Sequence, residues 1–153
     1  MNESINTTKV DLLAANLISR FNVKAGGTGA AAKSLSGGNL QKFIVGREID
    51  AKPKLLIVSQ PTWGVDVGAA ALIRGELLKL RDAGCAVLVV SEELDELFEL
   101  SDRLVVIARG KLSPSIATRD ATVEQVGQWM AGIFDGGPAD PKSAAAPTQR
   151  QES

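Results

Sequence analysis

Histidine and tyrosine are absent from this chain of 153 residues, and cysteine occurs once, at Cys85. Without histidine, the chain cannot build a Ser-His-Asp triad or a histidine-ligated metal site. A single cysteine excludes an internal disulfide and a cysteine-rich zinc site. Any chemistry must therefore use carboxylates, hydroxyls, amides, lysine, arginine or backbone N–H groups.

The chain also lacks a charge imbalance and a long apolar run. The 17 lysines and arginines nearly balance the 18 acidic residues, which argues against a basic nucleic-acid-binding face. The longest apolar runs, at 55–58 and 86–90, have the length of strands and are too short to cross a bilayer. The polar start, MNESINTTKV, does not resemble a secretory leader. We therefore expect a cytoplasmic protein without direct membrane insertion.

Apolar periodicity predicts an α/β fold with a largely parallel sheet. Continuous apolar runs at 55–59 and 86–91 predict strands buried on both faces, joined by a helix over 68–82. Before the first strand, we predict a helix over 9–21 that buries Val10, Leu13, Leu17 and Phe21, then a glycine-rich linker over 24–34 and a helix that ends near Asp50. After the second strand, we predict a short helix over 93–100 that buries Leu94, Leu97 and Phe98, then a third strand over 103–108 and a hairpin turn at 109–111. The last predicted element is an amphipathic helix built on Val123, Val126, Trp129, Met130 and Ile133.

The run of Leu35, Ser36, Gly37 and Gly38 opens one of the predicted helices. Backbone N–H groups at a helix start attract anions, and glycine lets a phosphate approach the main chain closely. A serine before a helix is also a common N-cap, so this string alone is a weak indicator of phosphate binding.

Several further motifs follow in a fixed order. LSGGN at 35–39 is followed by QK at 41–42, and the strand at 55–59 is followed by Gln60, Pro61 and Thr62. GVDVGA comes next, at 64–69. SEE, at 91–93, lies at the end of the second predicted strand, and SDR, at 101–103, lies at the start of the third. Over about residues 10–133, this order resembles the second half of an ABC transporter nucleotide-binding domain. The resemblance is greatest to the second ATP-binding domain of simple-sugar and nucleoside importers.

The resemblance implies a partial P-loop NTPase (ABC ATPase) core, with a mostly parallel sheet flanked by helices. Residues 1–34 are then the end of the helical subdomain and a Gly/Ala-rich linker. Residues 35–134 are the signature loop and carboxyl-terminal lobe. Residues 135–153, rich in proline, alanine and serine, are predicted to be a disordered tail.

The resemblance also assigns candidate site residues. Ser36, Gly37, Gly38 and Asn39 match the signature loop, which in the family binds ATP held by the opposite domain, and Asp66 matches the D-loop aspartate. The cofactors implied are ATP and Mg²⁺, held through a partner domain. The implied partners are a second nucleotide-binding domain and membrane subunits, with the chain peripheral to the membrane on its cytoplasmic side.

Three positions of the catalytic site depart from the family pattern. Ser59 stands where the family has the Walker B aspartate, Gln60 where it has the carboxylate that polarises water, and Glu92 at the switch position, often histidine. Neither Ser59 nor Gln60 supplies a charge for a hard cation or a base for water. No intact catalytic set and no metal site are therefore expected in this chain.

A P-loop is also missing from the sequence. Residues 27–34 match its pattern except for Ala32 in place of the last glycine, but they follow a predicted helix instead of a strand. We interpret them as linker.

A cluster of acidic residues lies at the start of the predicted helix over 93–100 and along it. These residues, Glu92, Glu93, Asp95, Glu96 and Glu99, are interpreted as a solvated helix face.

Three functions remain open at this point. The chain is an ATP-binding component that offers a signature loop to a partner, a catalytically silent scaffold or interaction module, or a non-functional gene fragment with exposed strand edges. A chromosome-maintenance ATPase also shares the signature loop, but this chain has no coiled-coil heptads.

Overall fold

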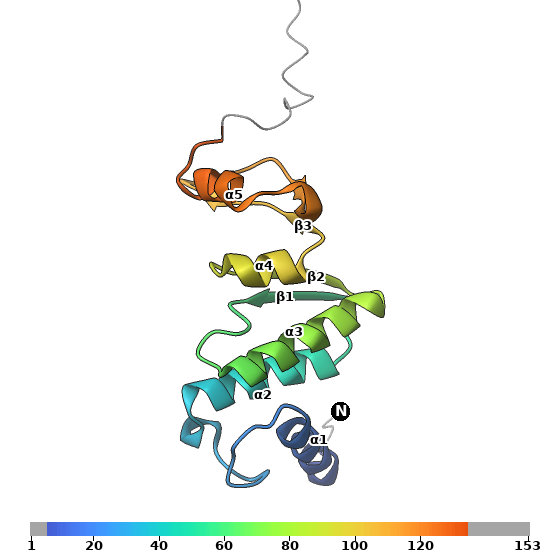
Figure 1. Ribbon diagram of the computed structural model, residues 1–153. Coiled ribbons are helices and arrows are strands. Elements are labelled where there is room, and N and C mark those ends of the chain that lie inside the picture. The colour runs from blue at the N-terminus through green and yellow to red at the C-terminus, as the bar shows by residue number, and fades with distance from the viewer. Residues whose placement is uncertain (1–5, 135–153) are drawn as a thin grey trace, which may run out of the picture. The chain divides into compact units, whose positions relative to one another are not determined.

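The computed structural model describes residues 6–134, and the chain divides after Leu100 into two compact units (Figure 1). The first unit holds α1 (Thr7–Arg20), η1 (Ala32–Ser34), α2 (Gly37–Asp50), β1 (Leu55–Ser59), α3 (Val67–Asp82), β2 (Ala86–Val90) and α4 (Leu94–Leu100). The second holds β3 (Arg103–Leu104), β4 (Ile107–Ala108), β5 (Lys111–Leu112), β6 (Ile116–Ala117), η2 (Thr118–Asp120) and α5 (Val123–Met130).

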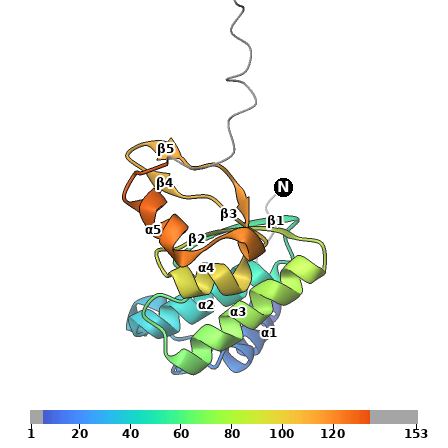
Figure 2. The same cartoon turned by 45° about the horizontal axis from the view of Figure 1, so that its top comes forward.

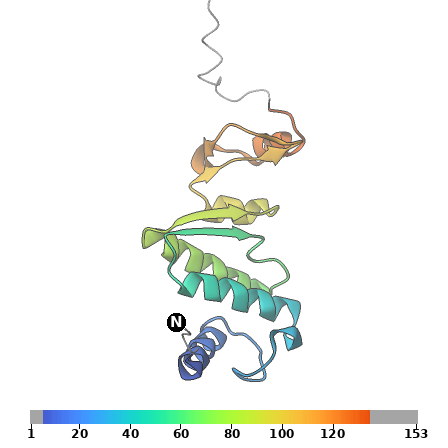
Figure 3. The ribbon, with the colours of Figure 1, turned by 180° about the vertical axis from the view of Figure 1, so that it is seen from behind.

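A parallel pair of strands forms the centre of the first unit. β1 and β2 pair from Leu55 opposite Ala86 to Ser59 opposite Val90, and α3 connects them. Helices α2 and α3 lie together on one side of this pair (Figures 1 and 3). This strand–helix–strand unit confirms the predicted α/β fold, because parallel neighbours need such a crossover.

One face of the strand pair is exposed, which corrects the prediction that both faces are buried. Leu56 is buried, and Val58, Val87 and Val89 pack against the core on the helix side. On the opposite side, four large apolar residues are 50–63% exposed: Leu55, Ile57, Leu88 and Val90. The apolar composition of the two strands is typical of a sheet that is buried on both faces. Within residues 6–134, however, helices cover only one face of the strand pair.

The core of the first unit joins α1 to the helices over the sheet. Leu17 and Phe21 are buried, whereas Val10 and Leu13 are about half exposed, so the predicted apolar stripe of this helix is buried only at its end. A Cβ on Gly46 of α2 would lie 2.5 Å from the ring of Phe21. Glycine at this position therefore lets Phe21 pack directly against the backbone of α2.

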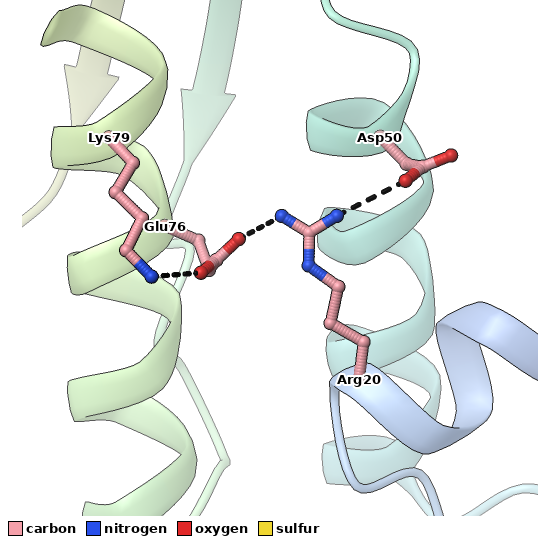
Figure 4. A network of polar contacts seen from close by, with 4 residues as sticks. All are labelled: Arg20, Asp50, Glu76 and Lys79. Carbon is pink, nitrogen blue, oxygen red and sulfur yellow. Dashed lines mark hydrogen bonds and ion pairs between the residues drawn. The ribbon is translucent and has the colours of Figure 1, made fainter.

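An ion-pair network ties three helices together (Figure 4). The guanidinium of Arg20 at the end of α1 contacts Asp50 of α2, at 3.2 Å, and Glu76 of α3. Lys79 donates to the other carboxylate oxygen of Glu76 at 2.8 Å. Burial raises the pKa of Glu76, but the hydrogen bonds from Lys79 and Arg20 outweigh burial and lower it overall. The network fixes the end of α1 against both sheet-covering helices.

The short helix α4 buries residues different from those predicted. Leu94, Leu97 and Phe98 are half-buried, whereas Glu96 and Leu100 are buried. Helix α4 packs beside α3, where Arg74 pairs with Glu99 at 2.9 Å, and Leu100 joins the hydrophobic core of the first unit.

In the second unit, the predicted third strand is divided into two short pieces. β3 pairs antiparallel with β6, and β4 with β5. Between them, the N–H of Val106 donates to the side chain of Ser113 and its carbonyl accepts from the N–H of Ser113, which interrupts regular pairing.

The hairpin and the last helix of this unit agree better with the sequence. Arg109 and Gly110 both have positive φ, which confirms the predicted tight turn between β4 and β5. Helix α5 lies beside this hairpin (Figure 2) and buries Val126 and Trp129. Val123, Met130 and Ile133 are about half exposed, so its apolar face is narrower than predicted.

Two predictions concern the ends of the chain and the membrane. The tail at 135–153 lies outside the described residues. Among residues 6–134, no helix has the length and the apolar character needed to cross a bilayer.

Candidate functional site

Residues 35–38, which the resemblance assigns to the signature loop, lie at the start of α2, where Ser36 occupies the N-cap position. The Ser36 side chain caps no backbone N–H of the helix. Its hydroxyl instead accepts a hydrogen bond from the Asn39 amide at 2.8 Å, and the Asn39 oxygen accepts from the N–H of Lys24 at 2.8 Å. The first-turn amides of α2 therefore have no side-chain cap, while Asn39 is used to hold the loop in place.

The two glycines of this loop have different surroundings. Apart from its chain neighbours and the backbone of its own helix, no heavy atom lies within 4 Å of a Cβ built on Gly37. A Cβ on Gly38 would lie 2.6 Å from the carbonyl oxygen of Gly64, a backbone atom that cannot easily move. Gly38 is thus required by close packing, whereas Gly37 leaves open space above the start of the helix.

Asp66, which the resemblance assigns to the D-loop, lies two positions after Gly64. Asp66 is the N-cap of α3, and its Oδ1 accepts from the N–H of Ala69 at 2.9 Å. This hydrogen bond is the main reason why the pKa of Asp66 lies below its ordinary value, and Lys42 contributes to the same direction. The structure therefore places an ionised carboxylate beside the signature loop, since Gly64 contacts Gly38.

The end of β1 carries the two positions that depart from the family pattern. Ser59 is exposed at the last position of the strand. Gln60 adopts a left-handed conformation, with φ of 49°, and its N–H donates to the carbonyl of Val90 at 2.7 Å. Its side-chain oxygen accepts from the hydroxyl of Ser91 at 3.3 Å. The Gln60 amide is thus used to join the ends of β1 and β2.

This donor set does not fit Mg²⁺. Hard cations select charged oxygen ligands, and Ser59 and Gln60 offer a neutral hydroxyl and a neutral amide. Glu92 is exposed on the segment after β2. No group of three acidic, histidine or cysteine side chains gathers anywhere within residues 6–134 in a way that could hold a metal.

Gln41 connects the signature helix to the end of β1. Its side-chain amide donates to the carbonyl of Gln60 at 2.9 Å and to that of Pro61 at 3.1 Å. The next residue, Lys42, is buried and donates to the carbonyl of Asn22 at 2.7 Å. From the sequence, Gln41 and Lys42 were noted only as part of a motif. Their hydrogen bonds could not be predicted, because the acceptors are backbone carbonyls about 20 positions away in the chain.

A second side chain missed by the sequence analysis holds the turn after Gln60. Glu96 is 3% exposed, and its Oε1 accepts from the hydroxyl of Thr62 at 2.7 Å. The prediction of a solvated acidic face is therefore wrong for Glu96, although Glu92, Glu93, Asp95 and Glu99 are exposed. Residues 27–34, which resemble a P-loop, form an exposed turn and η1 after α1, not a loop between a strand and a long helix.

Solved structures with the same fold are ABC ATP-binding cassettes. A dimeric cassette in a post-hydrolysis state bound to ADP and Pi matches with a TM-score of 0.66 and 19% identity, over 79% of this chain and 52% of that chain. An ATP-binding subunit of an ABC transporter matches with a TM-score of 0.64 and 16% identity, over 87% of this chain and 52% of that chain. The fold is therefore that of part of an ABC ATPase cassette, a P-loop NTPase domain.

The relatives found by sequence are ATP-binding proteins of importers. The chain is 45% identical over 128 residues to a nucleoside import ATP-binding protein of Lactococcus lactis, covering 84% of this chain and 25% of that protein. It is 46% identical over 119 residues to a guanosine import ATP-binding protein of Bacillus subtilis, covering 78% and 23%. A ribose import ATP-binding protein of Rhizobium etli is 38% identical over 128 residues, covering 84% and 25%.

The chain is thus homologous to the carboxyl-terminal part of ABC import ATP-binding proteins, which confirms the resemblance stated from its motifs. It spans about a quarter of the length of these relatives. No protein-family model matches the chain.

Proposed function

We propose that the chain acts in an ABC importer for nucleosides or sugars and presents its signature loop to ATP held by a partner cassette. The substrate class follows the named relatives, which import nucleosides, guanosine and ribose. The importer's membrane subunits would hold the chain at the cytoplasmic side of the membrane. ATP and Mg²⁺ would both be bound mainly by the partner.

The observation that carries this proposal is the open first turn of α2. Its N–H groups have no side-chain cap, and a Cβ placed on Gly37 would meet no atom within 4 Å from outside its chain neighbours and its own helix backbone. A phosphate can approach these donors, and the dipole of a 14-residue helix favours an anion there. Ser36 adds a hydroxyl at the same position.

The surroundings of this turn suit a contact with a second domain. Asp66 is exposed and ionised next to the loop, so it can accept hydrogen bonds from a partner. The role proposed for Asn39 is indirect, because its side-chain amide already bonds to Ser36 of the loop and to the N–H of Lys24.

The end of β1 supports no turnover by this chain alone. Ser59 and Gln60 provide neither a carboxylate to accept a proton from water nor a charge for a cation. Glu92 adds negative charge after β2, which would oppose a phosphate bound at this edge. We therefore assign the chemistry of hydrolysis to the partner's site, completed in trans by the loop of this chain.

The test is reconstitution of the 153-residue chain with a complete ABC cassette, such as the amino-terminal cassette of a nucleoside importer. Steady-state phosphate release is measured for the cassette alone and with increasing amounts of the chain. The expected result is a saturable increase in hydrolysis. Gly37→Val should abolish the increase without unfolding the chain, because the added side chain enters open space where the phosphate would lie.

Gly75→Val is the matched control, since a Cβ on Gly75 of α3 also meets no atom within 4 Å. It is expected to stimulate like the original chain. If Gly37→Val stimulates as well as Gly75→Val does, the signature-loop proposal is wrong.

A catalytically silent scaffold remains the second candidate, favoured by the neutral Ser59 and by the structural use of the Gln60 side chain. It predicts that the chain binds the cassette equally well with and without ATP. Binding that requires ATP and is lost in Gly37→Val would exclude it.

A further inference from the structure

The turn at residues 60–64, which follows β1, is held by hydrogen bonds from two helices. From α2, the side-chain amide of Gln41 donates to two backbone carbonyls of the turn. From α4, which packs beside α3 (Figure 2), the carboxylate of Glu96 accepts from the hydroxyl of Thr62 at 2.7 Å. Thr62 lies in the middle of the turn, so its hydrogen bond determines where the turn lies relative to α4.

The position of this turn affects the start of α2. Gly64, at its end, places its carbonyl oxygen 2.6 Å from where a Cβ on Gly38 would lie. Asp66 follows two residues later and caps α3. A displacement of the turn would therefore move a backbone group that packs against the residues assigned to the signature loop.

Glu96 contributes less to stability than its burial suggests. It is 3% exposed, and its Oε1 binds Thr62. Within residues 6–134, however, no group donates a hydrogen bond to its buried Oε2. Burying a carboxylate whose hydrogen-bonding capacity is only partly used costs free energy. Replacing such a pair by apolar side chains of similar shape is often neutral or stabilising.

We propose that Glu96 is a positioning residue that acts through Thr62 and holds the turn at 60–64 where Gly64 packs against Gly38. The pair is retained for this placement and adds no net stability. Its effect on ATP hydrolysis rests on the proposed function, because only a signature loop that meets a partner's phosphate converts placement into stimulation. The placement itself is a property of the isolated chain.

A carboxylate suits this role better than an apolar contact does. Hydrogen bonds to carboxylates are short and directional, whereas apolar contacts allow a turn to slide. Phosphate binding by backbone N–H groups depends on such placement, because a misplacement of about 1 Å by a distant substitution can lower activity roughly 100-fold. Glu96 can therefore affect the start of α2 without touching it.

The first measurement tests whether the pair is needed for stability. Thr62→Val and Glu96→Leu are combined in the full 153-residue chain, so that neither partner is left buried without the other. Urea unfolding compares this double variant with the original chain and with Glu93→Leu, a matched change at an exposed position just before α4. We expect the double variant to unfold at the same or a higher urea concentration.

The second measurement reads the placement directly. The amide signals of Gly37 and Gly38 are followed by heteronuclear NMR in the isotopically labelled chain, since both lie far in sequence from the substitutions. We expect the signal of Gly38 to move in the double variant and to stay in Glu93→Leu. Thr62→Ser retains the hydroxyl that donates to Glu96 and should leave the signal close to its original position.

The third measurement uses the reconstituted cassette of the proposed function. The double variant is expected to lower the maximal stimulation of hydrolysis by roughly tenfold, because the N–H donors are misplaced. The concentration of chain that gives half of the maximum should stay the same, since Glu96 is buried and the surface that meets the cassette is kept. Thr62→Ser should stimulate like the original chain.

These results separate the inference from the proposed function. If the original chain does not stimulate the cassette, the proposed function fails, and the unfolding and NMR comparisons still decide the inference. A double variant that is unfolded, or clearly less stable than Glu93→Leu, would make the pair a source of stability and overturn the inference. Unchanged signals of Gly37 and Gly38 in the double variant, or an equal shift in Thr62→Ser, would overturn it as well.

Discussion

The start of α2 and the end of β1, which Gln41 joins, differ in the groups they offer for the proposed function. At the start of α2, the signature loop offers backbone N–H groups and open space above Gly37, with the exposed Asp66 beside it. At the end of β1, every function would depend on side chains, and those present are Ser59 and Gln60. Backbone N–H donors are retained under most substitutions, as long as the helix and its glycines are kept. A site made of side chains changes with every substitution of the residues that form it.

The hydrogen bonds support the same distinction. Gln60 uses its backbone and its side chain to join the two strands, and its carbonyl also accepts from Gln41. The strand end is therefore a structural junction. In the signature loop, the Asn39 amide donates to Ser36 and its oxygen accepts from the N–H of Lys24, so neither side chain caps the first-turn N–H groups of α2.

The largest effect is expected from breaking the contact between the signature loop and the D-loop. Gly38→Val forces a side chain against the carbonyl of Gly64 and should lower the free energy of unfolding by about 1–3 kcal/mol. Urea unfolding measures this change. Gly37→Val, in open space, should stay within about 1 kcal/mol of the original chain. Equal losses for the two variants would contradict the close packing described at Gly38.

Breaking the bridge between the two regions comes next. Gln41→Leu removes the donor to the carbonyls of Gln60 and Pro61 and should cost about 1–3 kcal/mol, because part-buried acceptors lose their partner. Thermal unfolding, with Gln128→Leu on an exposed position of α5 as control, measures it. In the reconstituted system, we expect stimulation of the cassette to weaken less than in Gly37→Val. A variant as stable as the control would show that the bridge is dispensable.

A smaller effect, dependent on pH, is expected at the D-loop. Asp66→Ala removes the N-cap of α3 and should lower the unfolding temperature less than Gln41→Leu does. Because the pKa of Asp66 is lowered in the fold, its stabilisation is present above the ordinary pKa of 3.8 and is lost as the pH falls through the lower folded value. The difference between the original chain and Asp66→Ala should therefore shrink below about pH 4. A difference that grows on acidification would reverse the assigned sign.

The smallest effect on stability is expected from restoring carboxylates at the strand end. Ser59→Asp combined with Gln60→Glu changes an exposed residue and conserves the size of the other, so stability should change by roughly 0.5 kcal/mol or less. The double variant should still release no phosphate from ATP by itself, because the sequence contains no complete P-loop. Turnover by the isolated double variant would show that the remaining residues bind nucleotide, and the two regions would then be alike.

Local patterns predicted much of the fold. The apolar runs at β1 and β2, the crossover helix α3 and the tight turn at Arg109 and Gly110 all follow from signals within a few residues. The third strand was not predictable in its divided form, because Ser113 bonds to Val106 seven positions earlier. The exposed face of the β1–β2 pair was also missed, because the apolar sequence of a strand does not reveal whether one or both of its faces are covered.

The candidate site shows the same limit. Ser36, Gly37, Gly38 and Asp66 were predicted from motif order, since each belongs to a short string at a turn or a helix start. The Arg20 network and the bond from Thr62 to Glu96 join residues 30–56 positions apart. No periodicity encodes such pairs.

By itself, the sequence determined the kinship with ABC cassettes, the order of the elements and the neutral strand end, because these are properties of contiguous residues. The tertiary structure alone decided that Gly38 lies against Gly64, that Gln41 bridges the two regions and that one face of the strand pair is open. The physical reason is that contacts between distant residues depend on how helices and strands pack in space. That packing is set by the whole chain at once and not by any local string.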